Sequence, residues 1–134
     1  MRMYSIVLIE DSEGDARLVD EMLKETGLEH GLFWFGDGAG AESFFSEGGR
    51  ADLILVDLHL PGTNAYELIR SLRRQGESAE TTIVAYTGSS CPGDIARAME
   101  EGVACYLVKP MGLEEMEETS MVLREMLLGK EKSG

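Results

Sequence analysis

Short runs of consecutive apolar residues, separated by stretches with helical spacing, constrain the fold of this chain more than any other feature. The runs cover residues 5–9, 53–56, 82–86 and 105–108, with a fifth candidate at 32–35. Runs of four or five residues that are apolar on both alternating faces, and rich in Ile and Val, are typical of strands covered on both sides. The sequence therefore predicts a buried parallel sheet.

The segments between these runs repeat apolar residues every three or four positions, which places them on one face of a helix. Leu18 with Met22 and Ile95 with Met99 are examples. The segment 39–45 is the least regular, because nearby glycines lower helix propensity, but it must still connect two strands. Five strands alternating with five helices predict an α/β fold with a doubly wound open sheet and right-handed crossovers.

Length and composition indicate one domain whose partners are proteins. The 134 residues suit a single domain, predicted at residues 1–128, followed by a flexible polar tail at 129–134. The net charge of −13 argues against direct binding to nucleic acid. No apolar run is long enough to cross a membrane, and acids at positions 10 and 11 leave no room for a secretion signal. We therefore expect a cytoplasmic protein.

Chemically reactive side chains follow four of the predicted strands at their carboxyl ends. Run 5–9 is followed by Glu10 and Asp11, run 53–56 by Asp57, run 82–86 by Thr87 and run 105–108 by Lys109. In an open parallel sheet the ligand crevice lies at this edge. The sequence thus predicts that three acids, a hydroxyl and an amine converge there.

Such a cluster suits phosphoryl transfer at a divalent metal. Clustered carboxylates repel one another unless a cation neutralises them, and hard oxygen ligands favour Mg²⁺. One carboxylate can then attack phosphorus while the metal and an ammonium balance charge on the transferred group. We predict Asp57 as the nucleophile and Lys109 as the phosphoryl contact. Any one of these residues alone would be read as a helix cap or a surface side chain, so the prediction depends on their occurring together.

Four motifs resemble the receiver domains of two-component response regulators, which are CheY-like proteins with a flavodoxin-like fold. The motifs are Ile-Glu-Asp-Ser at 9–12, Leu-Val-Asp-Leu-His-Leu-Pro at 55–61, Tyr-Thr-Gly at 86–88 and Tyr-Leu-Val-Lys-Pro at 106–110. The resemblance spans nearly the whole chain and implies strand order 2-1-3-4-5. It also implies a single-domain regulator that accepts a phosphoryl group from a sensor histidine kinase.

The resemblance further implies individual roles. Magnesium would be bound by Glu10, Asp11, Asp57 and the backbone carbonyl of His59. Thr87 would be the switch hydroxyl and Tyr106 the aromatic residue that reports the switch. A cis peptide bond would precede Pro110. Partners would be the kinase and a downstream target or phosphotransfer protein, or a second copy of the chain in a homodimer.

Two positions depart from the family pattern, and other functions stay open. Glu10 replaces the more usual aspartate, and Ala65 replaces a glycine, so that Gly62 would supply the loop's flexibility. One alternative is a binding module with the same fold that is never phosphorylated. Others are a metal-dependent phosphatase or a flavin carrier, which would need an Asp-x-Asp motif or a Ser/Thr-Gly-rich loop after the first strand.

Overall fold

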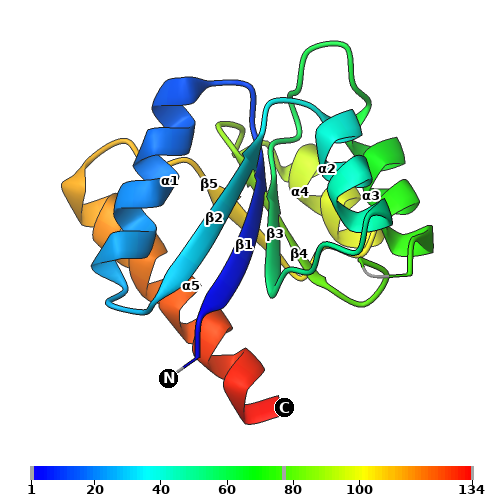
Figure 1. Ribbon diagram of the computed structural model, residues 1–134. Coiled ribbons are helices and arrows are strands. Elements are labelled where there is room, and N and C mark those ends of the chain that lie inside the picture. The colour runs from blue at the N-terminus through cyan, green and yellow to red at the C-terminus, as the bar shows by residue number, and fades with distance from the viewer. Residues whose placement is uncertain (1, 77, 134) are drawn as a thin grey trace.

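The computed structural model describes residues 2–76 and 78–133, which form a five-stranded parallel sheet covered by helices on both faces (Figure 1). The strands are β1 (Tyr4–Ile9), β2 (His30–Phe35), β3 (Leu53–Val56), β4 (Thr82–Thr87) and β5 (Cys105–Val108). Their order in the sheet is β2-β1-β3-β4-β5, and each neighbouring pair is parallel. The predicted fold class and strand order are therefore confirmed.

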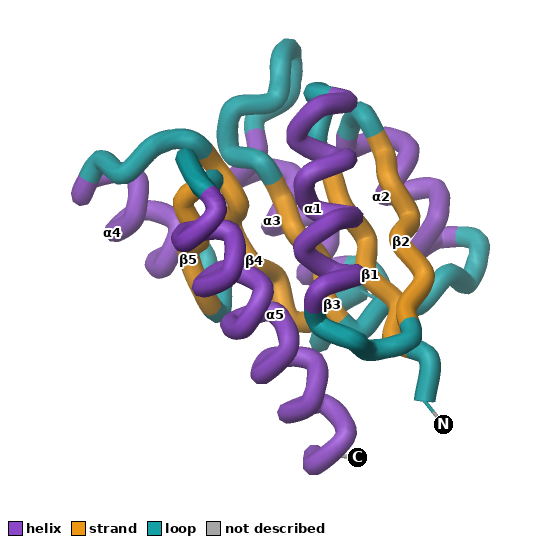
Figure 2. Tube along the Cα trace, turned by 90° about the vertical axis from the view of Figure 1, so that its left-hand side faces the viewer, coloured by secondary structure: helices purple, strands orange, loops and turns teal. Residues whose placement is uncertain are grey.

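The helices are α1 (Glu13–Glu25), α2 (Gly38–Ser46), α3 (Ala65–Arg74), α4 (Pro92–Glu100) and α5 (Leu113–Ser133). Figure 2 shows α1 and α5 together on one face of the sheet, with α2, α3 and α4 on the other. α5 continues past the residue 128 boundary that the sequence predicts, so residues 129–133 are helical and the flexible tail stays a prediction. Among the described residues, no helix is both long and apolar enough to cross a bilayer.

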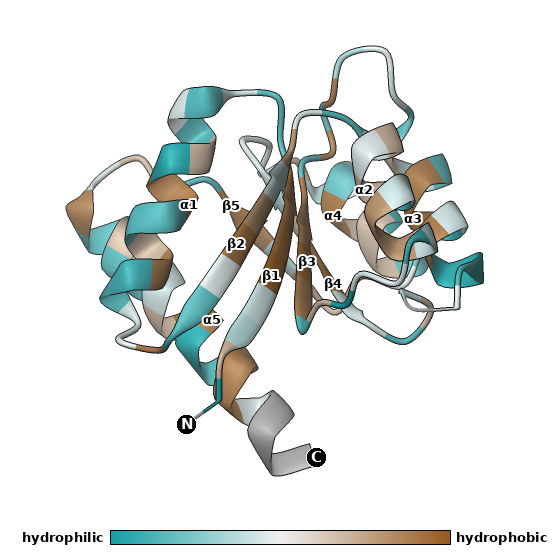
Figure 3. Ribbon diagram, viewed as in Figure 1, coloured by the Kyte–Doolittle hydropathy of each residue, from teal (hydrophilic) through white to brown (hydrophobic). Residues whose placement is uncertain are grey.

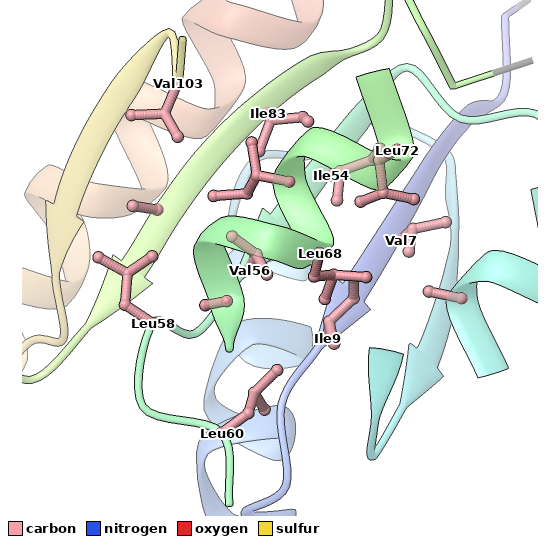
Figure 4. Packing of buried hydrophobic residues seen from close by; sticks show 14 of the residues in the cluster. Val7, Ile9, Ile54, Val56, Leu58, Leu60, Leu68, Leu72, Ile83 and Val103 are labelled. Atoms are coloured by element: carbon pink, nitrogen blue, oxygen red, sulfur yellow. The ribbon is translucent and has the colours of Figure 1, made fainter. Parts of the chain in front are cut away.

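Two apolar layers form the core, one on each face of the sheet. Alternate residues of β1 contribute to each, because successive side chains of a strand point to opposite faces: Val7 and Ile9 pack toward α2 and α3, whereas Ile6 and Leu8 pack toward α1 and α5. Figure 4 shows the first layer, with Leu68 and Leu72 of α3 lying over the strands. Figure 3 shows the hydrophobic residues concentrated on the central strands.

Polar side chains fix where the helices begin. The hydroxyl of Ser12 accepts a hydrogen bond from the Asp15 backbone N–H at the start of α1, and the side chain of Asn64 accepts two at the start of α3. Such caps satisfy backbone donors that have no partner within the helix. They fix the starts of α1 and α3, the helices that follow the carboxyl ends of β1 and β3 along the chain.

The opposite edge of the sheet is held by one guanidinium group. Arg73, near the end of α3, donates hydrogen bonds to the backbone carbonyls of Ala79, Thr81 and Gly102. These carbonyls belong to the connections that lead into β4 and β5. One side chain thus ties two loops together at the amino edge.

Candidate functional site

The three predicted acids lie together at the carboxyl edge. Ile9 and Val56 are paired in the parallel register of β1 and β3, so the residues that follow them leave the sheet side by side. The backbone N–H of Asp57 donates to the carbonyl of Ile9 at 3.0 Å. Carboxylate oxygens of Glu10, Asp11 and Asp57 lie within 4.8 Å of one another, so the three residues could hold a metal ion. Glu10 and Asp57 are buried, whereas Asp11 is exposed.

Lys109 reaches the same cluster from the end of β5. Its Nζ lies 2.7 Å from Glu10 Oε1 and 3.1 Å from Asp57 Oδ2. The backbone N–H of Lys109 donates to the carbonyl of Thr87, which joins the ends of β5 and β4. The predicted convergence of acids and amine is therefore present in the fold.

Asp15 is a fourth carboxylate that the strand-end pattern missed. Its Oδ2 lies 2.8 Å from Lys109 Nζ, a contact as short as that with Glu10. Asp15 lies in the first turn of α1 rather than at the end of a strand. Its place three residues after the capping Ser12 was the available signal, because side chains of a first turn above the carboxyl edge can face the site.

The electrostatics of the cluster follow from burial and ion pairing. Desolvation lowers the pKa of Lys109, but hydrogen bonds with Asp15, Glu10 and Asp57 outweigh it, so the pKa is raised and the ammonium stays charged. Burial raises the pKa of Glu10 above its usual value, although Lys109 and the Ser12 N–H both lower it. The site thus favours a bound cation, which would offset the cost of the buried Glu10 carboxylate.

Thr87 and Tyr106 occupy the side of the site formed by β4 and β5. The Thr87 hydroxyl is buried and has no hydrogen-bond partner among the described residues. The Tyr106 hydroxyl donates to the backbone carbonyl of Ser89 at 2.8 Å, in the loop between β4 and α4. A buried hydroxyl without a partner is costly, so Thr87 is suited to receive a ligand oxygen.

The loop after Asp57 is shaped by local contacts. The backbone N–H of His59 donates to Asp57 Oδ1 at 2.9 Å, which orients the carboxylate. Gly62 adopts a φ of 66°, a left-handed conformation that glycine allows, whereas Ala65 is buried at the start of α3. Gly62 therefore supplies the flexible turn that was expected of it in place of residue 65.

The expectation of a cis bond before Pro110 is wrong, because no peptide bond among the described residues is cis. The trans form is the one that X–Pro bonds favour.

An aromatic side chain from β2 reaches the loop that carries the acids. Trp34 donates a hydrogen bond from Nε1 to the backbone carbonyl of Glu10. Phe33 and Phe35, which point to the other face of the sheet, pack against the ring of Phe44 in α2. The aromatic run of β2 thus packs against α2 through Phe33 and Phe35 and contacts the acidic loop through Trp34.

Comparisons with known proteins identify the family. Residues 6–120 match the family model of the response regulator receiver domain. The chain is 33% identical over 117 residues to the response regulator Rcp1 of Synechocystis sp., a match that covers 83% of this chain and 80% of Rcp1. The crystal structure of the Mn²⁺-bound form of Rcp1 has a TM-score of 0.78 at 30% identity, covering 91% and 92% of the two chains.

Two further solved structures share the fold. The phosphorylated cyanobacterial phytochrome response regulator RcpA has a TM-score of 0.82 at 26% identity, covering 95% of each chain. The receiver domain of the sensor histidine kinase PA1611 from Pseudomonas aeruginosa PAO1, with magnesium coordinated in its active-site cleft, has a TM-score of 0.76 at 27% identity, covering 94% of this chain and 98% of that one. This chain therefore belongs to the response regulator receiver-domain family, as a signalling module with an acidic cluster that could hold a metal ion.

Proposed function

We propose that this receiver domain accepts a phosphoryl group on Asp57 from the phosphohistidine of a sensor kinase, in a Mg²⁺-dependent reaction that changes its contacts with other proteins. The observation that carries the proposal is the surroundings of Asp57. Its buried carboxylate lies beside Glu10 and Asp11 on one side, and Oδ2 is 3.1 Å from Lys109 Nζ on the other. Oxygen ligands and a fixed ammonium around one carboxylate suit phosphoryl transfer.

In the proposed reaction a carboxylate oxygen of Asp57 attacks phosphorus. The new P–O bond forms as the P–N bond to the kinase imidazole breaks, and the imidazole leaves as the neutral base after taking up a proton. Glu10, Asp11, Asp57 and the carbonyl of His59 would bind Mg²⁺, which would neutralise charge on the phosphoryl oxygens. Lys109 would donate a hydrogen bond to one of those oxygens.

Thr87 and Tyr106 would convert this local change into an altered surface. Phosphorylation adds about −1.5 to −2 charge and strong acceptor oxygens. The Thr87 hydroxyl, which has no partner among the described residues, would turn toward the phosphoryl group. That movement would reposition the loop after β4, to which the Tyr106 hydroxyl is bonded through the Ser89 carbonyl. Tyr106 would then report the switch.

The proposed output surface is formed by α4, β5 and α5. Each of these elements exposes a large apolar side chain, namely Met99, Val108 and Met121. Exposed apolar side chains near a charge switch suit a surface whose affinity for a partner changes. A target protein, a phosphotransfer protein or a second copy of the chain could bind there, and the proposed location is the cytoplasm, as is typical of response regulators.

A binding module that is never phosphorylated is the second candidate. It would use the same surface but would not need the reactive groups. Asp57, Thr87 and Lys109 are all present at the carboxyl edge, where each could contact a phosphoryl group. Their presence favours the phosphorylated switch.

Phosphate incorporation from acetyl phosphate tests the proposal, with and without Mg²⁺, by intact mass. We expect the native chain to gain one phosphoryl group only with Mg²⁺, and Asp57→Asn to gain none. Asp20→Asn, the same substitution on the outer side of α1, is the matched control and should behave as the native chain does. If the native chain gains nothing from acetyl phosphate or from candidate kinases, the binding module is the better description.

A further inference from the structure

We propose that Asp15 is a positioning residue that holds the Lys109 ammonium on the α1 side of the site, and that it thereby strengthens metal binding while weakening binding of the phosphoryl group. The proposal rests on the proposed function, because it concerns regulation of the same site. It assigns to Asp15, which is not a strand-end residue, an influence on the balance between metal binding and phosphoryl binding.

The first argument is the unusual use of the Asp15 side chain. An acidic residue three positions after a capping serine commonly reaches back to the backbone N–H of that serine. Here the Ser12 N–H instead donates to Glu10 Oε2 at 3.1 Å. The Asp15 carboxylate is thus left to accept a hydrogen bond from Lys109 Nζ at 2.8 Å. The helix start is arranged so that Asp15 faces the site.

The second argument is the hydrogen-bonding capacity of the ammonium. A lysine ammonium has three N–H donors. Nζ of Lys109 contacts three carboxylates, those of Glu10, Asp15 and Asp57. A phosphoryl group on Asp57 would place its oxygens beyond the present carboxylate, so Lys109 can follow them only by loosening another contact. Glu10 is fully buried, whereas the side chain of Asp15 is 35% exposed, so Asp15 is the partner that water can most readily replace.

The third argument is the balance of charge. Glu10, Asp11, Asp57 and Asp15 surround a single ammonium. The negative charge of Asp15 attracts a divalent cation at the neighbouring carboxylates and repels a phosphoryl group at Asp57. Asp15 therefore increases the affinity of the site for the cation and decreases its affinity for the phosphoryl group. A substitution at Asp15 that only disturbed the local structure would instead weaken the binding of both ligands.

The test compares Asp15→Asn with Glu13→Gln. Both variants remove one negative charge from the first turn of α1, but Glu13 pairs with Arg17, whereas the carboxylates around Lys109 are those of Glu10, Asp15 and Asp57. Mg²⁺ affinity is followed by the fluorescence of Trp34, whose indole is bonded to the acidic loop. Beryllofluoride, a phosphoryl mimic, is titrated at saturating Mg²⁺ and followed by ¹⁹F NMR.

We expect Asp15→Asn to raise the Kd for Mg²⁺ about three- to fivefold and to lower the Kd for beryllofluoride by a similar factor, as one partly exposed charge would do. Glu13→Gln should leave both close to the native values. Weaker binding of both ligands by Asp15→Asn, or no change in either, would overturn the proposal. If the native chain itself does not bind beryllofluoride, it is the proposed function that fails, and this is seen before any variant is made.

Discussion

Trp34 Nε1 lies 2.6 Å from the backbone carbonyl oxygen of Glu10, so the edge strand β2 is directly bonded to the loop that carries the acid pair. Trp34 is the only tryptophan of the chain and is partly exposed. Its fluorescence should therefore respond to events at the metal site, with no interference from a second indole.

We predict that Mg²⁺ changes the emission of Trp34 in a saturable manner, and that Asp11→Asn raises the midpoint about tenfold, because it removes one of three carboxylate ligands. The measurement is a fluorescence titration at constant ionic strength. Asp20→Asn is the control for a general loss of charge. An emission change with the same midpoint in Asp11→Asn would show that the ion acts elsewhere.

Glu10→Gln should stabilise the metal-free protein at neutral pH. Burial raises the pKa of Glu10 above 4.5, so the folded state binds the proton more tightly than the unfolded state does. Stability is therefore lost as the pH rises from 4.5 through the raised pKa, and glutamine, which does not ionise, avoids this loss. In EDTA the variant should have the higher Tm at neutral pH, and the difference should shrink as the pH falls to about 4.5.

The same comparison in excess Mg²⁺ provides the check on this interpretation. A bound cation stabilises the ionised form of Glu10, so the native chain should gain more in Tm from Mg²⁺ than the variant does. Glu13→Gln, on the exposed side of α1, should show neither effect. A variant that is less stable than the native chain at every pH would contradict the prediction.

Gly49→Ala should cost about 1–3 kcal/mol in the free energy of unfolding, as expected for overpacking. A Cβ at Gly49 would lie 2.5 Å from the backbone carbonyl oxygen of Phe44, and that oxygen accepts a hydrogen bond from the Gly49 N–H. Urea denaturation measures the loss. Gly76→Ala is the matched control, since among the described residues beyond its chain neighbours a Cβ there has no atom within 4 Å. Equal stability of the two variants would refute the steric argument.

Tyr106→Phe should loosen the loop between β4 and α4 while leaving Mg²⁺ affinity unchanged. The substitution removes only the hydroxyl that donates to the Ser89 carbonyl at 2.8 Å, worth about 0.5–1.5 kcal/mol. Amide hydrogen exchange in residues 88–91 should become faster, and exchange in β1 should not. Unchanged exchange in the loop would mean that this hydrogen bond does not restrain it.

The sheet was predictable from the sequence because its strands are buried on both faces and therefore read as unbroken apolar runs. α2 was harder to predict. Its glycines lower helix propensity, and their reason is tertiary: a Cβ at Gly38 would lie 2.9 Å from Leu68 Cδ1 of α3, and one at Gly40 would lie 2.9 Å from Phe35 Cδ1 of β2. Close packing between elements is not visible in a local pattern.

The site was predictable for the residues at strand ends, since parallel strands bring their carboxyl ends to one edge. Asp15 and Trp34 were missed for the same physical reason. Asp15 reaches Lys109 from a helix turn, and Trp34 reaches the acidic loop from an edge strand, each through the orientation of its side chain. The isomer of the bond before Pro110 was likewise not fixed by the residues that carry the resemblance.

The guanidinium of Arg73 restrains the sheet at its amino edge. Because it joins the connections into β4 and β5, these two strands cannot separate or slide at their starting ends without breaking hydrogen bonds to three carbonyls. The movement proposed for Thr87 and the loop after β4 would therefore be expected at the carboxyl edge and in α4, while the starts of β4 and β5 stay joined.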